Sequence, residues 1–276
     1  MSEKNRIAGL INLKNEAQNK LLYIHSNARG DVCVNGEPSK LSLLPAGKWR
    51  AAGEIKDAGY GLILPPNASV PQNTFFAVGG GETLLWIGDD EKNGIGVVSP
   101  GFVGVSQKFA LWRPIRAGVL TVSDKGASGE RVDTAGPALA DMATALGSQV
   151  LHRDIVPDER NVISTRLREW CGDGLQMILV TGGTGLSRRD VTPEALLDVG
   201  DRTVPGFGEI MRSRSMLYTE RGLLTRSVAV TCGDTLIVSF PGSERAVRQC
   251  FEAISGALRH GVGTLNGWDA ECGAHT

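Results

Sequence analysis

Apolar residues in the first part of the chain fall into short runs separated by turn-forming residues. The runs cover residues 21–24, 41–44, 62–64, 83–87 and 95–98. Between them stand Asn35-Gly36, Pro65-Pro66-Asn67, Gly79-Gly80-Gly81 and Lys92-Asn93-Gly94. Short apolar runs bounded by glycine, proline and asparagine are typical of β-strands joined by tight turns. The pattern predicts a small, mostly β domain over residues 1–115, with one short helix expected over residues 12–22.

The pattern of apolar residues changes after Trp112-Arg113-Pro114. In the region that follows, strand and helix patterns alternate. Strands are predicted over 117–122, 149–156 and 177–181, and helices over 134–146, 160–170, 208–218 and 244–260. This alternation predicts an α/β fold for residues 116–276, with a mostly parallel sheet covered by helices on both faces. Two runs, 227–231 and 235–240, surround Cys232-Gly233-Asp234 and predict a hairpin at the edge of that sheet.

Charge and hydropathy exclude several classes of partner. Lysine and arginine number 29 and aspartate and glutamate 30, so no global field draws the protein to nucleic acid or to anionic lipid. The amino terminus is polar where a secretory peptide is apolar, and no apolar stretch reaches the roughly 18 residues of a membrane span. We therefore expect a soluble, cytoplasmic protein without nucleic-acid or membrane partners.

The cysteines form no recognisable disulfide or zinc pattern. They are odd in number, widely spaced and without a CxxC pair: Cys33, Cys171, Cys232, Cys250 and Cys272. Disulfide frameworks and zinc sites use paired or closely spaced cysteines. We expect reduced, structural thiols.

Three segments that directly follow predicted strands carry candidate binding residues. They are Thr121-Val122-Ser123-Asp124, the glycine-rich Thr181-Gly182-Gly183-Thr184-Gly185, and Pro241-Gly242-Ser243. In open α/β sheets, ligands bind beyond the carboxyl ends of the strands. Glycines let backbone N–H groups approach a phosphate closely, and the Thr184 hydroxyl adds a donor. A glycine turn without a ligand, and a serine that only caps the last helix, are the alternative interpretations.

Charged residues cluster just beyond the glycine-rich segment. Arg188, Arg189 and Asp190 precede Thr192-Pro193-Glu194, where a helix is expected to begin. Such a mixture suits a phosphate ligand that brings a magnesium ion, because carboxylates hold the metal and cations stabilise negative charge on phosphate. A surface salt bridge is the alternative for Arg-Asp. Asp158 is interpreted as the N-cap of the helix that follows it, and Asp124 and Asp133 have a loop-capping alternative.

Five segments taken in order resemble the molybdopterin adenylyltransferase family, which includes the MogA-type bacterial enzymes and the gephyrin G domain. They are LTVSDKGASGERVDTAGP, VPDE, TGGTGLSRRDVTPEA, PGFGEIMR and SFPGSERAV, within residues 117–267. The resemblance implies a three-layer α/β domain of the molybdenum-cofactor biosynthesis fold, forming a homotrimer. It also implies transfer of the adenylyl group of Mg²⁺-bound ATP to the phosphate of molybdopterin, which gives adenylylated molybdopterin and pyrophosphate.

The resemblance also implies roles for individual residues. Asp158 and Asp190 fall on the catalytic, metal-binding aspartates of the family. The positions that fall on its nucleotide- and pterin-binding segments are Ser123, Asp124, Gly182, Gly183, Thr184, Gly185, Arg188, Arg189, Glu194, Gly242 and Ser243. Lys125, Ala135 and Glu244 depart from the family, which commonly has arginine, serine and proline at these positions.

Other functions remain open at this point. A carrier or sensor would bind molybdopterin without turnover, and a tungsten pathway would use the same site residues. A scaffold would use residues 1–115, which match no motif, to contact other enzymes of cofactor biosynthesis.

Overall fold

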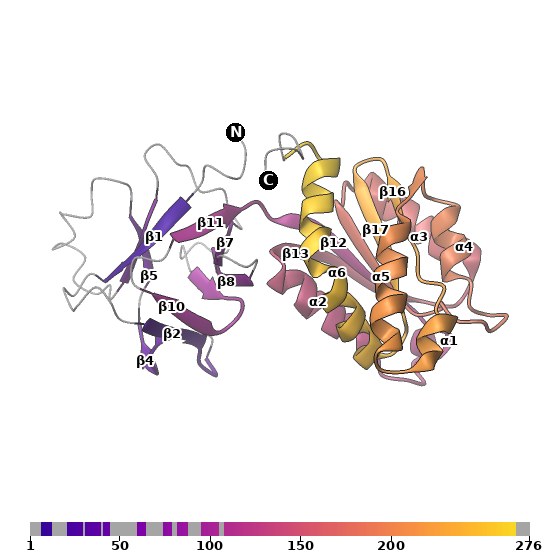
Figure 1. Cartoon of the computed structure of the whole chain (residues 1–276), viewed down its shortest axis with the longest axis horizontal. Helices are drawn as coiled ribbons and strands as arrows, with labels where there is room; N and C mark the ends of the chain where they lie inside the picture. Colours follow the sequence, from indigo (N-terminus) through magenta and orange to yellow (C-terminus); the bar gives the residue numbers. More distant parts are fainter. Residues whose placement is uncertain are drawn as a thin grey trace. The chain divides into compact units, whose positions relative to one another are not determined.

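A computed structural model describes residues 7–12, 21–29, 31–39, 41–44, 60–64, 74–78, 82–87, 95–104 and 108–268 (Figure 1). The chain divides into two compact units, Met1–Pro114 and Ile115–Thr276. Each unit is described by itself.

The amino-terminal unit is built from β-strands, which confirms the prediction of a mostly β region. One sheet has the order β5-β6-β1-β11-β7-β8-β9 and the other the order β10-β2-β3-β4. The strands are β1 (Ile7–Asn12), β2 (Leu21–Ser26), β3 (Val32–Val34), β4 (Glu37–Pro38), β5 (Leu41–Leu44), β6 (Tyr60–Ile63), β7 (Phe75–Val78), β8 (Glu82–Ile87), β9 (Ile95–Val97), β10 (Gly101–Gly104) and β11 (Lys108–Trp112). Both sheets contribute to one core, in which Leu22 and Val103 meet Leu62 and Phe76.

The helix expected over residues 12–22 is wrong at both of its ends. Asn12 closes β1, and Leu22 lies in β2, while residues 13–20 fall outside the described ranges. Leu22 and Ile24 are buried and Tyr23 between them is exposed, so the period is two, which is that of a strand. The turn expected at Asn35-Gly36 is confirmed, since both residues have positive φ. The turns expected at 65–67, 79–81 and 92–94 lie outside the described residues.

The carboxy-terminal unit is an α/β domain around one mixed sheet of order β13-β12-β14-β17-β16-β15. Its strands are β12 (Ile115–Val122), β13 (Ser148–Val156), β14 (Met177–Thr181), β15 (Arg202–Thr203), β16 (Ala229–Cys232) and β17 (Thr235–Phe240). Its helices are α1 (Asp124–Ala127), α2 (Ala135–Ala145), α3 (Arg160–Gly172), α4 (Thr192–Leu197), α5 (Pro205–Met216), the 3₁₀ helix η3 (Glu220–Leu224) and α6 (Glu244–Leu265). The neighbours β13, β12, β14 and β17 run parallel.

Helices cover both faces of this sheet, as predicted (Figure 1). Val119 points to the face covered by α2, α5 and α6, and the next residue, Leu120, points to the face covered by α3 and α4. Alternate side chains of a strand lie on opposite faces, so continuous apolar runs are needed where both faces are buried. All five residues of β14 are buried, which is why its bounds were readable from the sequence.

Two details differ from the predictions. The hairpin of β16 and β17 exists, but it is not at the edge, because β15 pairs with β16 and β17 lies inside the sheet. Both residues of β15 are exposed, so this strand carries no apolar pattern. Helix α6 continues to Leu265, beyond the expected end at residue 260.

The remaining features concern membranes and thiols. In the part of the chain that the structure describes, no helix combines the length and apolar character needed to cross a bilayer. Cys33, Cys171, Cys232 and Cys250 are free thiols, and residue 272 lies outside the described ranges. Burial, followed by the neighbouring Cys232, raises the pKa of Cys171 to about 12, so this thiol is not an active nucleophile at neutral pH.

Candidate functional site

A cavity of about 410 Å³ lies where the carboxyl ends of adjacent parallel strands meet. The loops after β13, β12, β14 and β17 reach it, as expected for an open α/β sheet. Its lining residues are Thr121, Val122, Ser123, Gly126, Arg131, Val132, Asp133, Thr134, Ala135, Asp158, Thr181, Gly182, Gly183, Asp190, Gly242 and Ser243. The cavity therefore gathers residues from all three strand-end segments singled out in the sequence.

The glycine-rich loop after β14 needs glycine because neighbouring groups approach it closely. Gly182 has φ of 99°, and a Cβ there would lie 2.1 Å from the carbonyl oxygen of Val122. At Gly183 a Cβ would lie 2.3 Å from Thr192 Oγ1 and 2.9 Å from Asp158 Oδ1. Because the loop has no side chains at these two positions, the Val122 carbonyl, the Thr192 hydroxyl and the Asp158 carboxylate can all lie against its backbone.

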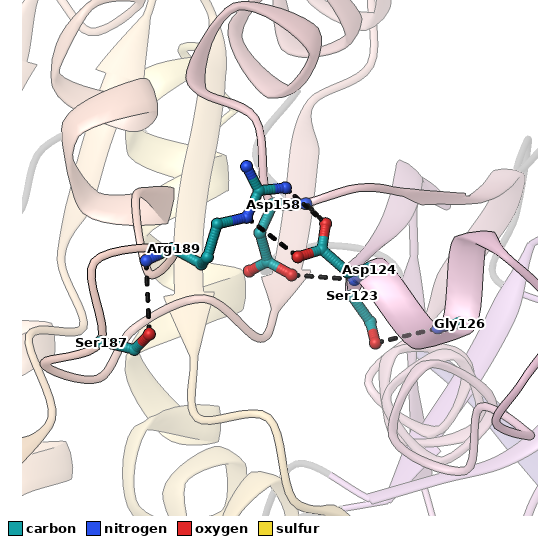
Figure 2. A network of polar contacts seen from close by, with 6 residues as sticks. All are labelled: Ser123, Asp124, Gly126, Asp158, Ser187 and Arg189. Atoms are coloured by element: carbon teal, nitrogen blue, oxygen red, sulfur yellow. Dashed lines mark hydrogen bonds and ion pairs between the residues drawn. The ribbon is translucent and has the colours of Figure 1, made fainter.

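Asp124 and Asp158 hold the ends of β12 and β13 together through reciprocal hydrogen bonds (Figure 2). The N–H of Asp124 donates to Oδ2 of Asp158 over 2.9 Å, and the N–H of Asp158 donates to Oδ1 of Asp124 over 3.0 Å. Ser123 precedes this pair and caps α1 by accepting the N–H of Gly126 at 3.1 Å. Each aspartate is thus both a loop tie and a carboxylate at the site.

Arg189 crosses from the loop after β14 to the carboxylate of Asp124 (Figure 2). Its Nε and terminal nitrogen donate to the two oxygens of Asp124 over 3.0 and 2.6 Å. The hydrogen bond from Arg189, and then the N–H of Asp158, lower the pKa of Asp124. A bidentate guanidinium is the strongest partner that a carboxylate finds among side chains.

Asp158 is in the opposite electrostatic situation. Burial of its carboxyl raises its pKa above the ordinary value, and the negative charges of Asp124 and Asp190 raise it further. The N–H of Asp124 and the charge of Arg189 act in the other direction but do not offset these effects. A carboxylate in this situation is stabilised by an added cation.

Asp190 lies in a turn between the glycine-rich loop and α4. Its Oδ2 accepts the N–H of Ser187 at 2.7 Å, and a Cβ at Gly185 would lie 2.9 Å from that oxygen. Asp190 and Asp158 both line the cavity, although they are 32 positions apart in the chain. The structure thus brings together the two aspartates that the resemblance assigned to catalysis.

Several other expected site residues do not line the cavity. They are Asp124, Thr184, Gly185, Arg188, Arg189 and Glu194. The Thr184 hydroxyl lies 3.4 Å from that of Thr225, and the carboxylate of Glu194 pairs with Arg226. Arg188 is exposed. Gly182, which does line the cavity, uses its N–H for the carbonyl of Phe240.

One of the capping predictions is wrong and two are confirmed. The N-cap of α3 is Glu159, not Asp158, because the Asp158 side chain turns to the N–H of Asp124. Ser243 caps α6 by accepting the N–H of Ala246 at 3.3 Å. Asp133 accepts the N–H groups of Ala135 and Gly136, so it caps the first turn of α2.

Three residues beside the site had no individual role predicted from the sequence. Thr121, the penultimate residue of β12, donates its hydroxyl to Asp133 over 2.7 Å and lines the cavity. Thr192 is fully buried, and no hydrogen-bond partner for its Oγ1 is found within the described ranges. Arg226 reaches the glycine-rich loop from the segment before β16. Thr121 and Thr192 stand in segments that the sequence singled out, whereas nothing local marks Arg226.

The described residues contain no group of three or more histidine, cysteine, aspartate or glutamate side chains that could hold a metal ion. Magnesium does not need such a group, because it is commonly held by one or two carboxylates together with phosphate oxygens and water. Asp158 and Asp190 line the same cavity, and their mutual repulsion contributes to the raised pKa of Asp158. This pair suits a divalent cation that arrives with a phosphate ligand.

Known proteins resemble the carboxy-terminal unit. The chain is 41% identical to molybdenum cofactor biosynthesis protein B of Escherichia coli K12 over 154 residues. This aligned region covers 54% of this chain and 88% of that protein. It is 35% identical over 156 residues to a molybdopterin adenylyltransferase of Helicobacter pylori J99, covering 55% of this chain and 89% of that one. The molybdopterin biosynthesis enzyme MoaB of Thermus thermophilus has a solved structure that superposes with a TM-score of 0.54 at 42% identity, covering 56% and 99% of the two chains.

A longer animal protein is also similar. The molybdenum cofactor synthesis protein cinnamon of Drosophila melanogaster is 40% identical over 151 residues, or 54% of this chain, but the chain spans only 25% of its length. The family described as "Probable molybdopterin binding domain" matches residues 118–260, which include the glycine-rich loop, Asp158 and Asp190, and leave out the amino-terminal unit. The chain therefore belongs to this family of molybdopterin-binding domains.

Proposed function

We propose that the carboxy-terminal unit transfers the adenylyl group of ATP to the phosphate of molybdopterin, as a molybdopterin adenylyltransferase in molybdenum cofactor biosynthesis. The observation that carries the proposal is the convergence of Asp158, Asp190 and the glycine-rich loop on one cavity. The name of the Helicobacter pylori relative supports the same activity. The Escherichia coli and Thermus thermophilus proteins, which are more similar in sequence, carry names that state only a biosynthetic role.

The nucleotide's phosphates belong beside Gly183 and the start of α6 in this proposal. Gly183 has no side chain to block them, and Gly242 and Ser243 line the same cavity, with Gly242 next to Gly182. Helix α6 has 22 residues, and the amino terminus of a long helix favours an anion. Ser243 already caps one N–H of its first turn, so the other N–H groups are the ones that would face phosphate.

Asp158 and Asp190 would hold Mg²⁺. When bound, Mg²⁺ supplies positive charge to the phosphate oxygens and so stabilises the charge that develops during transfer. The two carboxylates contribute by being held in place before the cation arrives: Asp158 by the N–H of Asp124, and Asp190 by the N–H of Ser187.

The reaction forms one bond and breaks one bond. A phosphate oxygen of molybdopterin attacks the α-phosphorus of ATP, and the bond to the bridging oxygen of pyrophosphate breaks. Since the attacking oxygen is already anionic, no protein group has to remove a proton from it. The protein contributes position and charge neutralisation, and Arg189, which directly precedes Asp190 and whose charge acts on Asp158, is the cation assigned to this role.

The test is a coupled assay for pyrophosphate release with purified full-length protein, Mg²⁺-ATP and molybdopterin. Pyrophosphate that depends on molybdopterin, and that Asp190→Asn fails to release while melting at the same temperature, is the expected result. Tight molybdopterin binding without pyrophosphate would overturn the transferase and indicate a carrier or sensor. Equal loss of melting temperature and activity in Asp190→Asn would remove the catalytic role of Asp190.

We also propose that the chain assembles as a homotrimer. Support comes from large apolar side chains that stay exposed on α5, after it and on η3: Ile210, Met216, Leu217, Tyr218, Leu223 and Leu224. Exposed apolar clusters of this kind are typical of subunit interfaces. Contact with other enzymes of cofactor biosynthesis is assigned to the amino-terminal unit. Removal of residues 1–114, followed by measurement of mass and activity, tests whether assembly needs that unit.

A further inference from the structure

Arg226 lies outside the strand-end loops but contacts the one that follows β14 at two places. It stands between η3 and β16, and its side chain is about one third exposed. Its Nε donates to the carbonyl of Gly185 over 2.8 Å, and a terminal nitrogen donates to the carbonyl of Asp190 over 2.6 Å. Its other terminal nitrogen pairs with Oε1 of Glu194. One planar guanidinium thus joins the glycine-rich loop, the aspartate turn and α4.

The two carbonyls that Arg226 binds stand at the base of a loop. Gly185 and Asp190 bracket residues 186–189, all of which are exposed. This loop carries Arg189, and Asp190 directly follows it. A short exposed loop gains little order from packing, so its residues are held by the hydrogen bonds at its base and by those from Arg189 to Asp124.

Two backbone hydrogen bonds also hold the glycine-rich loop. Its own N–H donates to the carbonyl of Thr184 over 2.8 Å, and the N–H of Thr192 donates to the carbonyl of Gly183 over 3.1 Å. A trans peptide points its N–H opposite to its carbonyl, so the N–H groups of Gly185 and Leu186 point away from Arg226. Arg226 therefore also fixes the direction of the donors in the glycine-rich loop.

Glu194 orients Arg226. Burial of the Glu194 carboxyl opposes ionisation, but the hydrogen bond from Arg226 and the nearby positive charges outweigh it, and the pKa of Glu194 is lowered. Its second oxygen, Oε2, is buried, and no hydrogen bond to it is found in the described part of the chain. The carboxylate is thus turned to Arg226 and not to the cavity, whose lining does not include Glu194.

We propose that Arg226 is a positioning residue, which, oriented by Glu194, fixes the base of the 186–189 loop and thereby places Asp190 and Arg189 for the transfer of the adenylyl group. The activity part of this inference rests on the proposed function. Lysine cannot replace arginine here, because an ammonium lacks the planar set of donors that reaches three acceptors at once.

The test compares Arg226→Lys with Arg166→Lys in the full-length chain. Arg166 is a matched control, since it also bridges acidic side chains, Asp154 and Glu169, at nearly the same exposure, and it lies on α3 away from the cavity. Amide hydrogen exchange over residues 183–192 should speed up about tenfold in Arg226→Lys, the factor that one hydrogen bond contributes. The same variant should lose about a hundredfold in kcat for pyrophosphate release with a smaller change in KM for ATP, as expected for a misplaced reacting group.

A second variant adds a readout that a general structural role would not change. In Arg226→Ala, millimolar guanidinium should restore slow exchange over residues 183–192, whereas ethylammonium should not. Unchanged exchange in Arg226→Lys, an equal rise in α6, or the same result for Arg166→Lys would overturn the positioning role. If the wild type releases no pyrophosphate but exchange over residues 183–192 speeds up in Arg226→Lys, the proposed transferase activity is wrong, whereas Arg226 still fixes the loop. If Arg226→Lys and the wild type release pyrophosphate at the same rate, Arg226 is not a positioning residue, and the transferase activity is still supported.

Discussion

Asp124 and Asp158 begin two neighbouring loops and exchange the same kind of hydrogen bond, yet their carboxyl groups differ electrostatically. Asp124 has a bidentate arginine, which lowers its pKa, whereas burial and two neighbouring aspartates raise the pKa of Asp158. The first carboxylate already has its counter-charge from Arg189. The second lacks one of comparable strength, and this is the property expected of a group kept for an incoming cation.

The largest expected effect is on turnover in Asp158→Asn. An asparagine oxygen can still accept the N–H of Asp124, so the loop tie is kept while the charge is lost. We expect kcat to fall about a thousandfold, as for loss of an electrostatic stabiliser in an active site. Melting at neutral pH should not fall, because the charge that is removed is an unfavourable one. A parallel loss of stability and activity would show that Asp158 is mainly structural.

The next effect concerns the glycine-rich loop, which lies close to the carboxylate of Asp158. In Gly182→Ala, the new Cβ would lie 2.1 Å from the Val122 carbonyl, in a backbone of positive φ. We expect a loss of about 3 kcal/mol in the free energy of unfolding, at the upper end of the cost of a strained residue. Gly233→Ala is the control, since its φ is also positive but nothing lies within 4 Å of its Cβ position. It should lose only about 1 kcal/mol, as measured by chemical denaturation. Equal losses would mean that the close approach to Val122 does not matter.

A smaller effect separates the two aspartates by the sign of their pH dependence. The lowered pKa of Asp124 means that its ion pair stabilises the fold above the ordinary pKa of 3.8 and that this stability is lost as pH falls through the lower folded pKa. The raised pKa of Asp158 has the opposite consequence. Its ionised carboxylate destabilises the fold above the raised folded pKa, and this destabilisation disappears as pH falls to the ordinary pKa of 3.8.

Denaturation of the wild type, Asp124→Asn and Asp158→Asn between pH 3 and 7 measures these signs. At neutral pH, Asp124→Asn should be less stable than the wild type, and Asp158→Asn at least as stable. Both differences should shrink toward the acidic end. A loss of stability at neutral pH in both variants would contradict the electrostatic distinction between the two loops.

The sequence predicted those parts of the site that depend on local order, and it could not predict those that depend on distant partners. The buried run of β14 and the Ser243 cap follow from neighbouring residues, and both are confirmed. The Asp158 cap was wrong because its true partner, the N–H of Asp124, is 34 positions away. The reach of Arg226 to Gly185 spans 41 positions, and no short pattern encodes such a contact.

The smallest effect is expected at Thr192, whose buried hydroxyl lies beside Gly183, as does the carboxylate of Asp158. Thr192→Val replaces the hydroxyl by a methyl group of the same shape, and a buried hydroxyl without a partner costs free energy, so stability should rise by up to about 1 kcal/mol. Thr231→Val is the matched control, because Thr231 Oγ1 is also buried without a partner among the described residues but lies in β16 and not beside Gly183. Both variants should therefore melt at or above the wild-type temperature, and only Thr192→Val should turn over several-fold more slowly. If the two variants turn over at the same rate, the Thr192 hydroxyl contributes neither to the position of Asp158 nor to ligand binding. The carboxylate of Asp158 is then the group at this site whose burial matters for turnover.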